Sequence, residues 1–156
     1  MKIAVLISGT GTNMAAIINA INAGELDASI EYVVSSNSHA KGIAKAQEAG
    51  IDTVVFEPAD YADPEAVDRK MVELFEARDV EYVVMAGYMR KVTPVLLDAY
   101  PNRVVNLHPA LLPKHRGAHG GQVSQLQQRL PQHIPHAQAH AGQQKDHHRH
   151  GYIMSG

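Results

Sequence analysis

The chain opens with Lys2-Ile-Ala-Val-Leu-Ile-Ser8, and Gly9-Thr10-Gly11-Thr12-Asn13 follow directly. A continuous apolar run of this length that ends at a glycine is typical of a strand buried on both faces of a parallel sheet. Residues 12–22 then carry apolar side chains at helical spacing, among them Ile18 and Ile21. The opening therefore predicts a buried strand, a tight glycine-containing loop and a helix.

The same alternation of strand and helix patterns continues along the chain. Asp63 followed by Pro64 predicts a helix start, because an N-cap acceptor precedes proline at the first helical position. We expect further strands at 29–36, 53–56, 81–86 and 103–107, and helices at 40–49, 64–78 (burying Val67, Met71, Leu74 and Phe75) and 94–99. Repeated units of this length predict an α/β fold with a doubly wound, mainly parallel sheet and right-handed crossovers. Ligands of such sheets bind at the carboxyl ends of the strands.

Composition excludes several classes of protein. The 156 residues carry a formal net charge of −2, which gives no electrostatic footprint for nucleic acid or for an anionic membrane surface. Cysteine is absent, so disulfides, thiolate metal sites and a cysteine nucleophile are excluded. No apolar run approaches the roughly 20 residues that span a bilayer, and a functional-looking loop begins by residue 9, which argues against a cleaved signal. We expect a soluble cytoplasmic protein.

The composition changes abruptly after Gly120. Residues 121–156 contain 3 of the 14 Lys and Arg residues and 1 of the 16 acids, together with 8 of the 9 Gln and 6 of the 10 His. Such a segment buries too little apolar surface to offset the entropy of ordering its backbone. We therefore expect an α/β domain over 1–120 and an anomalous Gln/His-rich tail over 121–156, disordered or produced by a shifted reading frame.

The loop after the first strand has features of an anion site. Glycines let backbone N–H groups approach an anion, and the helix that follows adds partial positive charge. The dinucleotide fingerprint would need a third glycine where Met14 stands, and an acid where Ser35-Ser36-Asn37 follows the second strand. The pattern therefore favours one phosphate of a ligand smaller than NAD. A tight turn that binds nothing is the alternative.

Two polar residues, Asn106 and His108, end the fifth expected strand. Their i, i+2 spacing puts both side chains on the same face of a strand. An asparagine amide can donate to a developing oxyanion, and histidine titrates near neutral pH and can transfer a proton. This pair is a candidate catalytic site, with a structural histidine as the alternative interpretation.

Four motifs occur in order at the ends of the first, fourth and fifth expected strands and just beyond them. They are Ile7-Ser-Gly-Thr-Gly-Thr-Asn13, Met85-Ala-Gly-Tyr-Met-Arg90, Asn106-Leu-His-Pro-Ala-Leu-Leu-Pro113 and Gly117-Ala-His-Gly120. Over residues 1–120 the chain resembles the phosphoribosylglycinamide formyltransferase family, folate-dependent enzymes of purine biosynthesis. The resemblance implies a Rossmann-like formyltransferase fold, here shortened after the fifth strand.

The resemblance also implies roles for particular residues, with 10-formyltetrahydrofolate as co-substrate and no metal. Gly11, Thr12 and Asn13 would hold the phosphate of the substrate. Asn106 and His108 would be catalytic. The folate pocket would be lined by Met89, Arg90, Lys91, Val92 and Asn106. Relatives use an arginine near position 64 as a folate contact, and Pro64 stands there in this chain.

The implied reaction begins when the glycinamide amine attacks the formyl carbon. Asn106 and His108 would stabilise the tetrahedral oxyanion, and His108 would return a proton to the leaving folate nitrogen. A carboxylate neighbour would raise the pKa of that imidazole; in the family it comes from an aspartate about 35 residues after the His-Pro motif. Here Gln144 stands near that position and Asp146 is the only acid of the tail. We therefore expect low or absent activity.

Three alternatives stay open. One is a remnant that binds substrate without catalysis. Another is a formyltransferase acting on a different amine, such as methionyl-tRNA formyltransferase, which Lys114-His-Arg-Gly-Ala118 faintly resembles; a tRNA partner would want a more basic surface. The third is a metal site in the tail at His133, His136 and His140, where Pro135 would break the helix that such a site needs.

Overall fold

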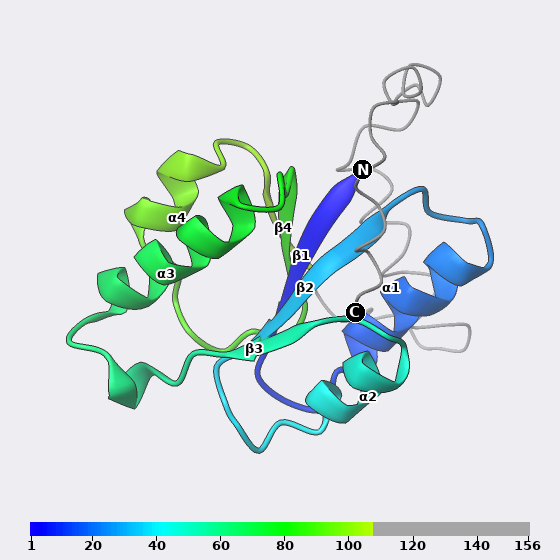
Figure 1. Ribbon diagram of the computed structural model, residues 1–156, viewed down its shortest axis with the longest axis horizontal. Coiled ribbons are helices and arrows are strands. Elements are labelled where there is room, and N and C mark those ends of the chain that lie inside the picture. The colour runs from blue at the N-terminus through cyan, green and yellow to red at the C-terminus, as the bar shows by residue number, and fades with distance from the viewer. Residues whose placement is uncertain (108–156) are drawn as a thin grey trace.

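Five parallel strands form one sheet in the order β3-β2-β1-β4-β5. Figure 1 labels the first four strands of the chain, with β1 between β2 and β4. This computed structural model describes residues 1–107. The strands are β1 (Lys2–Ile7), β2 (Ser29–Ser35), β3 (Thr53–Val55), β4 (Tyr82–Met85) and β5 (Val104–Asn106). The helices are α1 (Thr12–Asn22), α2 (Gly42–Glu48), α3 (Pro64–Glu76) and α4 (Pro94–Ala99), with a 3-10 turn at Pro58–Asp60. The predicted parallel α/β sheet is confirmed over these residues.

Helices cover both faces of the sheet (Figure 1). Helices α1 and α2 pack on one face and α3 and α4 on the other. The chain winds from β1 outward to β2 and β3, then returns to place β4 on the other side of β1. Neighbouring strands β1 and β4 therefore form the topological switch point, where the loops that leave them diverge and leave space for a ligand.

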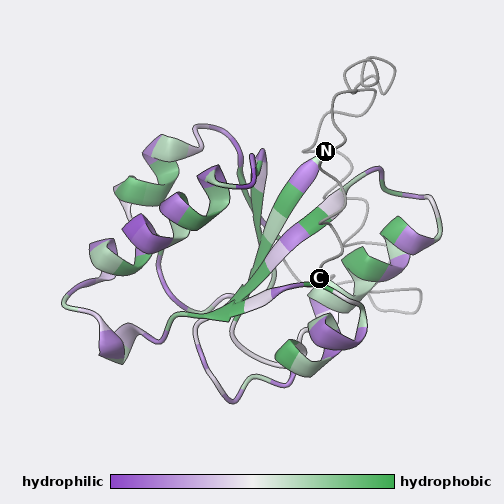
Figure 2. Ribbon diagram, viewed as in Figure 1, coloured by the Kyte–Doolittle hydropathy of each residue, from purple (hydrophilic) through white to green (hydrophobic). Residues whose placement is uncertain are grey.

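Strand β1 is the centre of both cores. Its Ile3, Val5 and Ile7 side chains pack toward α1 and α2. Ala4 and Leu6 pack toward α3 and α4. All five are fully buried, as expected of a strand whose two faces are covered. Figure 2 shows α1 and α3 carrying both hydrophobic and hydrophilic residues, in keeping with helices that turn one side to the sheet.

The helices differ from expectation in detail. Helix α1 buries Met14, Ala16, Ile17 and Ala20, whereas Ile18 and Ile21 are only partly buried. Its sequence is apolar on more than one side, so periodicity alone does not select the packed side. Helix α3 begins as predicted, with the Asp63 carboxylate accepting a hydrogen bond from the Ala66 N–H at 2.8 Å.

Helix α3 also buries three of its four expected apolar residues. Val67, Met71 and Phe75 are fully buried, and Leu74 is partly buried. The same helix buries one charged residue, Asp68. This carboxylate accepts hydrogen bonds from Thr93, at the end of the loop that follows β4.

Because of Tyr100, directly after α4, the free energy of unfolding should fall at alkaline pH. Burial and the negative charge of Glu76 raise the pKa of the Tyr100 phenol to about 12, from an ordinary value near 10. The phenol of the unfolded chain therefore ionises first, so stability is complete below about pH 10 and falls as the pH rises toward 12. Urea unfolding at pH 8 to 12 should show a smaller alkaline loss for Tyr100→Phe than for the natural chain. Equal losses in the two proteins would contradict this assignment.

Candidate functional site

A chain of hydrogen bonds joins three loops at the carboxyl edge of the sheet. The Ser8 hydroxyl, at the end of β1, lies 2.6 Å from the Ser36 hydroxyl, at the end of β2. The backbone N–H of Met89, in the loop after β4, donates to the Ser8 oxygen at 2.9 Å. Ser8 and Met89 are 81 positions apart in sequence. The loop after β1, which carries the predicted phosphate residues (the phosphate loop), and the loop after β4, which carries the predicted folate residues (the folate loop), are thus tied together beside the switch point.

In the phosphate loop, the backbone of Gly11 packs closely against the backbone of Gly42. Gly11 has φ +78°, and a Cβ at this position would lie 2.8 Å from the Gly42 Cα. The Gly42 N–H donates to the Gly9 carbonyl at 3.0 Å, which fastens the start of α2 to the loop. The absence of a side chain at Gly11 is therefore a packing requirement as well as a conformational one.

Helix α1 begins directly after this loop. Its N-cap is Gly11, a residue with no side chain that could cap the first turn. Thr12 is exposed, with its hydroxyl 3.1 Å from that of Thr10, and Asn13 is partly buried. The first-turn N–H groups of a helix point outward and carry partial positive charge. The three predicted phosphate residues thus lie together at a helix start that can receive an anion.

In the loop after β4, two of the predicted folate residues are exposed and two turn inward. Met89 is 82% exposed, and Lys91 is exposed as well. The Arg90 side chain is only 11% exposed and turns inward, where its Nη1 donates to the Tyr88 hydroxyl at 2.7 Å. Val92 is partly buried against the α3 and α4 core. An apolar and a cationic side chain therefore face solvent beside Ser8, while the guanidinium does not.

Sequence reasoning missed Asp68, a fully buried residue of α3. One carboxylate oxygen, Oδ2, accepts from both the N–H and the hydroxyl of Thr93 at 2.7 Å. The other oxygen, Oδ1, lies 3.7 Å from Arg90 Nη1. Its position next to Val67 and three residues before Met71 put an acid on the predicted buried side of the helix, a signal that could have identified it.

Asn106 ends β5 in register with Met85 of β4, which pairs in turn with Leu6 of β1. Val105 and Leu107 pack in the core on the α1 and α2 face. By strand alternation, the exposed Asn106 side chain belongs to the opposite face, which Leu6 and then Ser8 share. His108 lies outside the described residues, so its place beside Asn106 stays a prediction, as do all statements about 121–156.

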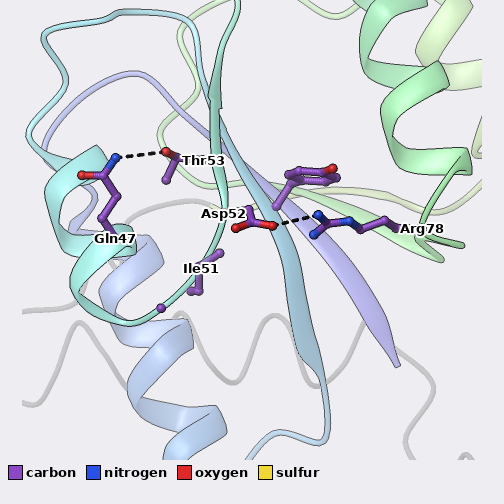
Figure 3. A pocket seen from close by; sticks show the side chains of 7 residues that line it. Gln47, Ile51, Asp52, Thr53 and Arg78 are labelled. Carbon is purple, nitrogen blue, oxygen red and sulfur yellow. Dashed lines mark hydrogen bonds and ion pairs between the residues drawn. The ribbon is translucent and has the colours of Figure 1, made fainter. Parts of the chain in front are cut away.

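A separate cavity of about 500 Å³ lies toward the amino ends of the strands, next to edge strand β3 (Figure 3). Arg78, just beyond α3, donates to the Asp52 carboxylate at 2.8 Å and to the Glu31 carbonyl at 3.0 Å. Its guanidinium also stacks on the Tyr32 ring, 4.1 Å from the centroid. These contacts fasten the end of α3 to β2 and β3. Since ligands of doubly wound sheets bind at the carboxyl ends, this cavity is not the candidate site.

Over residues 1–107, no group of three His, Cys, Asp or Glu side chains is arranged to hold a metal ion. In the same part of the chain, every helix falls short of the length and apolar character that crossing a membrane requires.

Comparison with known proteins identifies the family. A family model described as formyl transferase matches residues 1–127. The chain belongs to the formyl transferase family. It is 37% identical over 116 residues to phosphoribosylglycinamide formyltransferase of Haemophilus influenzae, which covers 74% of this chain and 55% of that protein. It is also 37% identical over 119 residues to the Escherichia coli protein of the same name, covering 76% and 56%.

Solved structures agree with this membership. Glycinamide ribonucleotide transformylase 1 from Symbiobacterium toebii superimposes with a TM-score of 0.68 at 40% identity, covering 75% of this chain and 55% of that one. Phosphoribosylglycinamide formyltransferase from Coxiella burnetii gives 0.67 at 37% identity, covering 75% and 55%. The formyl transferase chain thus spans about half the length of the relatives it matches. The predicted family and fold are confirmed.

Proposed function

We propose that this chain binds glycinamide ribonucleotide and 10-formyltetrahydrofolate side by side, the arrangement that transfer of the formyl group to the glycinamide amine requires. Gly11, Thr12 and Asn13 hold the phosphate of the first ligand. The pterin-bearing ligand lies against Asn106 and against the loop formed by Met89, Arg90, Lys91 and Val92, in which the Arg90 guanidinium turns inward. We expect the protein to act in the cytoplasm on these small molecules, without nucleic acid or membrane partners.

The observation that supports this proposal most directly is the hydrogen bond from the Met89 N–H to the Ser8 hydroxyl. It holds the loop that follows β4 against the loop that leads into α1. A sugar phosphate bound at the start of α1 and a formyl donor bound at Met89 would therefore lie side by side at the switch point. Transfer between two bound molecules needs this proximity, because it turns a bimolecular step into an effectively unimolecular one.

The chemistry follows from the residue types. The amine nitrogen attacks the formyl carbon, a C–N bond forms, and the carbonyl oxygen becomes an oxyanion. The Asn106 amide donates to that oxygen, a contribution that is commonly worth about 10²- to 10³-fold in rate. The oxyanion then returns to a carbonyl as the bond to the folate nitrogen breaks. His108 delivers a proton to that nitrogen, and the attacking amine loses one to solvent, so the product is a neutral formamide.

A second candidate function is binding without turnover. His108 acts as an acid more readily beside a carboxylate that raises its pKa. Near the position where the family carries that aspartate, this chain has Gln144, and Asp146 is the only acid of residues 121–156. The phosphate loop and the folate loop both lie within residues 1–107, so they contain no residue of that segment. Ligand binding with little or no formyl transfer is therefore the outcome that this composition favours.

Thermal unfolding tests the binding proposal separately from catalysis. Glycinamide ribonucleotide at 100 times its Kd should stabilise the full chain by about 2.7 kcal/mol, because it binds only the folded state. NAD is the control ligand and should leave the unfolding temperature unchanged, since Met14 replaces the third glycine of the dinucleotide motif. Formyl transfer is measured in parallel. No shift with glycinamide ribonucleotide, or an equal shift with NAD, contradicts the proposed phosphate site.

A further inference from the structure

The segment from Tyr88 to Thr93 is held at three points. The Met89 N–H bonds to Ser8, as described above. The Arg90 guanidinium bonds to the Tyr88 hydroxyl and pairs with Asp68. Thr93 donates twice to Asp68. One side chain, the Asp68 carboxylate, therefore takes part in two of the three attachments.

The attachment at Thr93 also sets the start of the next helix. The Thr93 hydroxyl donates to Asp68 Oδ2 and accepts from the Val95 N–H at 3.2 Å. Thr93 is thus the N-cap of α4 and a ligand of the buried carboxylate at once. Since α3 and α4 pack together on the same core, Asp68 fixes the end of the loop relative to the sheet.

The attachment at Arg90 depends on charge. Asp68 is fully buried, and within residues 1–107 its Oδ1 has no hydrogen-bond partner. The Arg90 guanidinium, 3.7 Å away, is the cation that compensates this oxygen. Removing one partner of a buried ion pair leaves the other uncompensated at high cost. The carboxylate therefore holds the guanidinium inward, under the loop.

We propose that Asp68 is the positioning residue of the folate loop: it holds Arg90 beneath the loop and Thr93 at its end, so that Met89 and Lys91 face the ligand. The inference rests on the proposed function, because it takes residues 89–92 to be the donor-binding surface. With the guanidinium withdrawn, the surface beside Ser8 offers the exposed Met89 side chain to an aromatic ring. Asp68 touches neither substrate.

Chemical modification tests the position of Arg90 without any ligand. Phenylglyoxal reacts with accessible guanidinium groups, and peptide mass spectrometry assigns the rate to each arginine. In the natural chain Arg90, 11% exposed, should react at least fivefold more slowly than Arg69, whose side chain is 59% exposed. Asp68→Asn should raise the Arg90 rate at least fivefold. The matched control Asp98→Asn changes an exposed acid of α4 and should leave it unchanged.

Ligand titration then connects this position to the proposed site. In calorimetry, Asp68→Asn should raise the Kd of 10-formyltetrahydrofolate at least fivefold and leave that of glycinamide ribonucleotide within twofold. A purely structural role would weaken both ligands together or neither. If the natural chain binds no folate, the proposed function fails. The modification experiment, which uses no ligand, still tests whether Asp68 holds Arg90 inward.

Besides an equal effect on both ligands, two results of the modification experiment overturn the positioning role. One is Arg90 reacting as fast as Arg69 in the natural chain, a comparison that holds even if the variant fails to fold. The other is a folded Asp68→Asn protein in which the Arg90 rate is unchanged.

Discussion

Gly11→Ala should lower the free energy of unfolding by about 2–5 kcal/mol. A left-handed backbone conformation costs a residue with a Cβ roughly 1–2 kcal/mol. The new Cβ would also lie 2.8 Å from the Gly42 Cα, and inserting an atom into packed backbone typically costs about 1–3 kcal/mol more. Urea unfolding measures the sum. Because relief requires the loop to move away from α2, the stabilisation by glycinamide ribonucleotide should disappear as well.

Gly24→Ala is a matched control for this variant. Gly24 has the same φ, +78°, but a Cβ there would meet nothing within 4 Å. It should show only the conformational cost of roughly 1–2 kcal/mol and retain the shift with glycinamide ribonucleotide. If the two alanine variants lose equal stability and bind equally well, the approach of Gly11 to Gly42 has no special importance and the proposed phosphate loop loses its structural basis.

Phe75→Ala should be the most destabilising single change in the core, with a loss of about 3–5 kcal/mol. Phe75 is fully buried among side chains of α3, α4 and the sheet, and its ring meets that of Tyr100 edge-on at a centroid distance of 6.5 Å. Truncation removes this contact and leaves a cavity under both helices. Since domains are commonly stable by only about 5–15 kcal/mol, urea unfolding should show a greatly lowered midpoint.

Two further variants test the same packing between α3 and α4. Phe75→Leu retains most of the volume and should lose about half as much or less, so it reports on the site even if the alanine variant fails to fold. Leu97→Ala alters a residue of α4 that is 43% exposed and should change stability by less than about 1 kcal/mol. A loss at Leu97 that equals the loss at Phe75 would mean that the α3 and α4 core is arranged differently.

The proposed site was predictable in the part that depends on neighbouring residues. The glycine loop before α1 and the polar end of β5 were recognised because strand ends and helix starts are local features of the sequence. The roles of Asp68 and of the inward-turned Arg90 were not. The place of Asp68 on the apolar side of α3 marks it as unusual, but its partners Arg90 and Thr93 lie 22 and 25 positions away, so the sequence does not show what it holds.

The sequence by itself determined the order and type of the elements in residues 1–107, because apolar runs, glycine stops and the Asp63-Pro64 helix start act over a few residues. The structure alone decided which side of α1 is buried, that Gly11 touches Gly42, and that Ser8 meets Met89. These contacts join residues far apart in the chain. They follow from the order in which strands assemble and from which helix covers which face, and local periodicity carries no information about either.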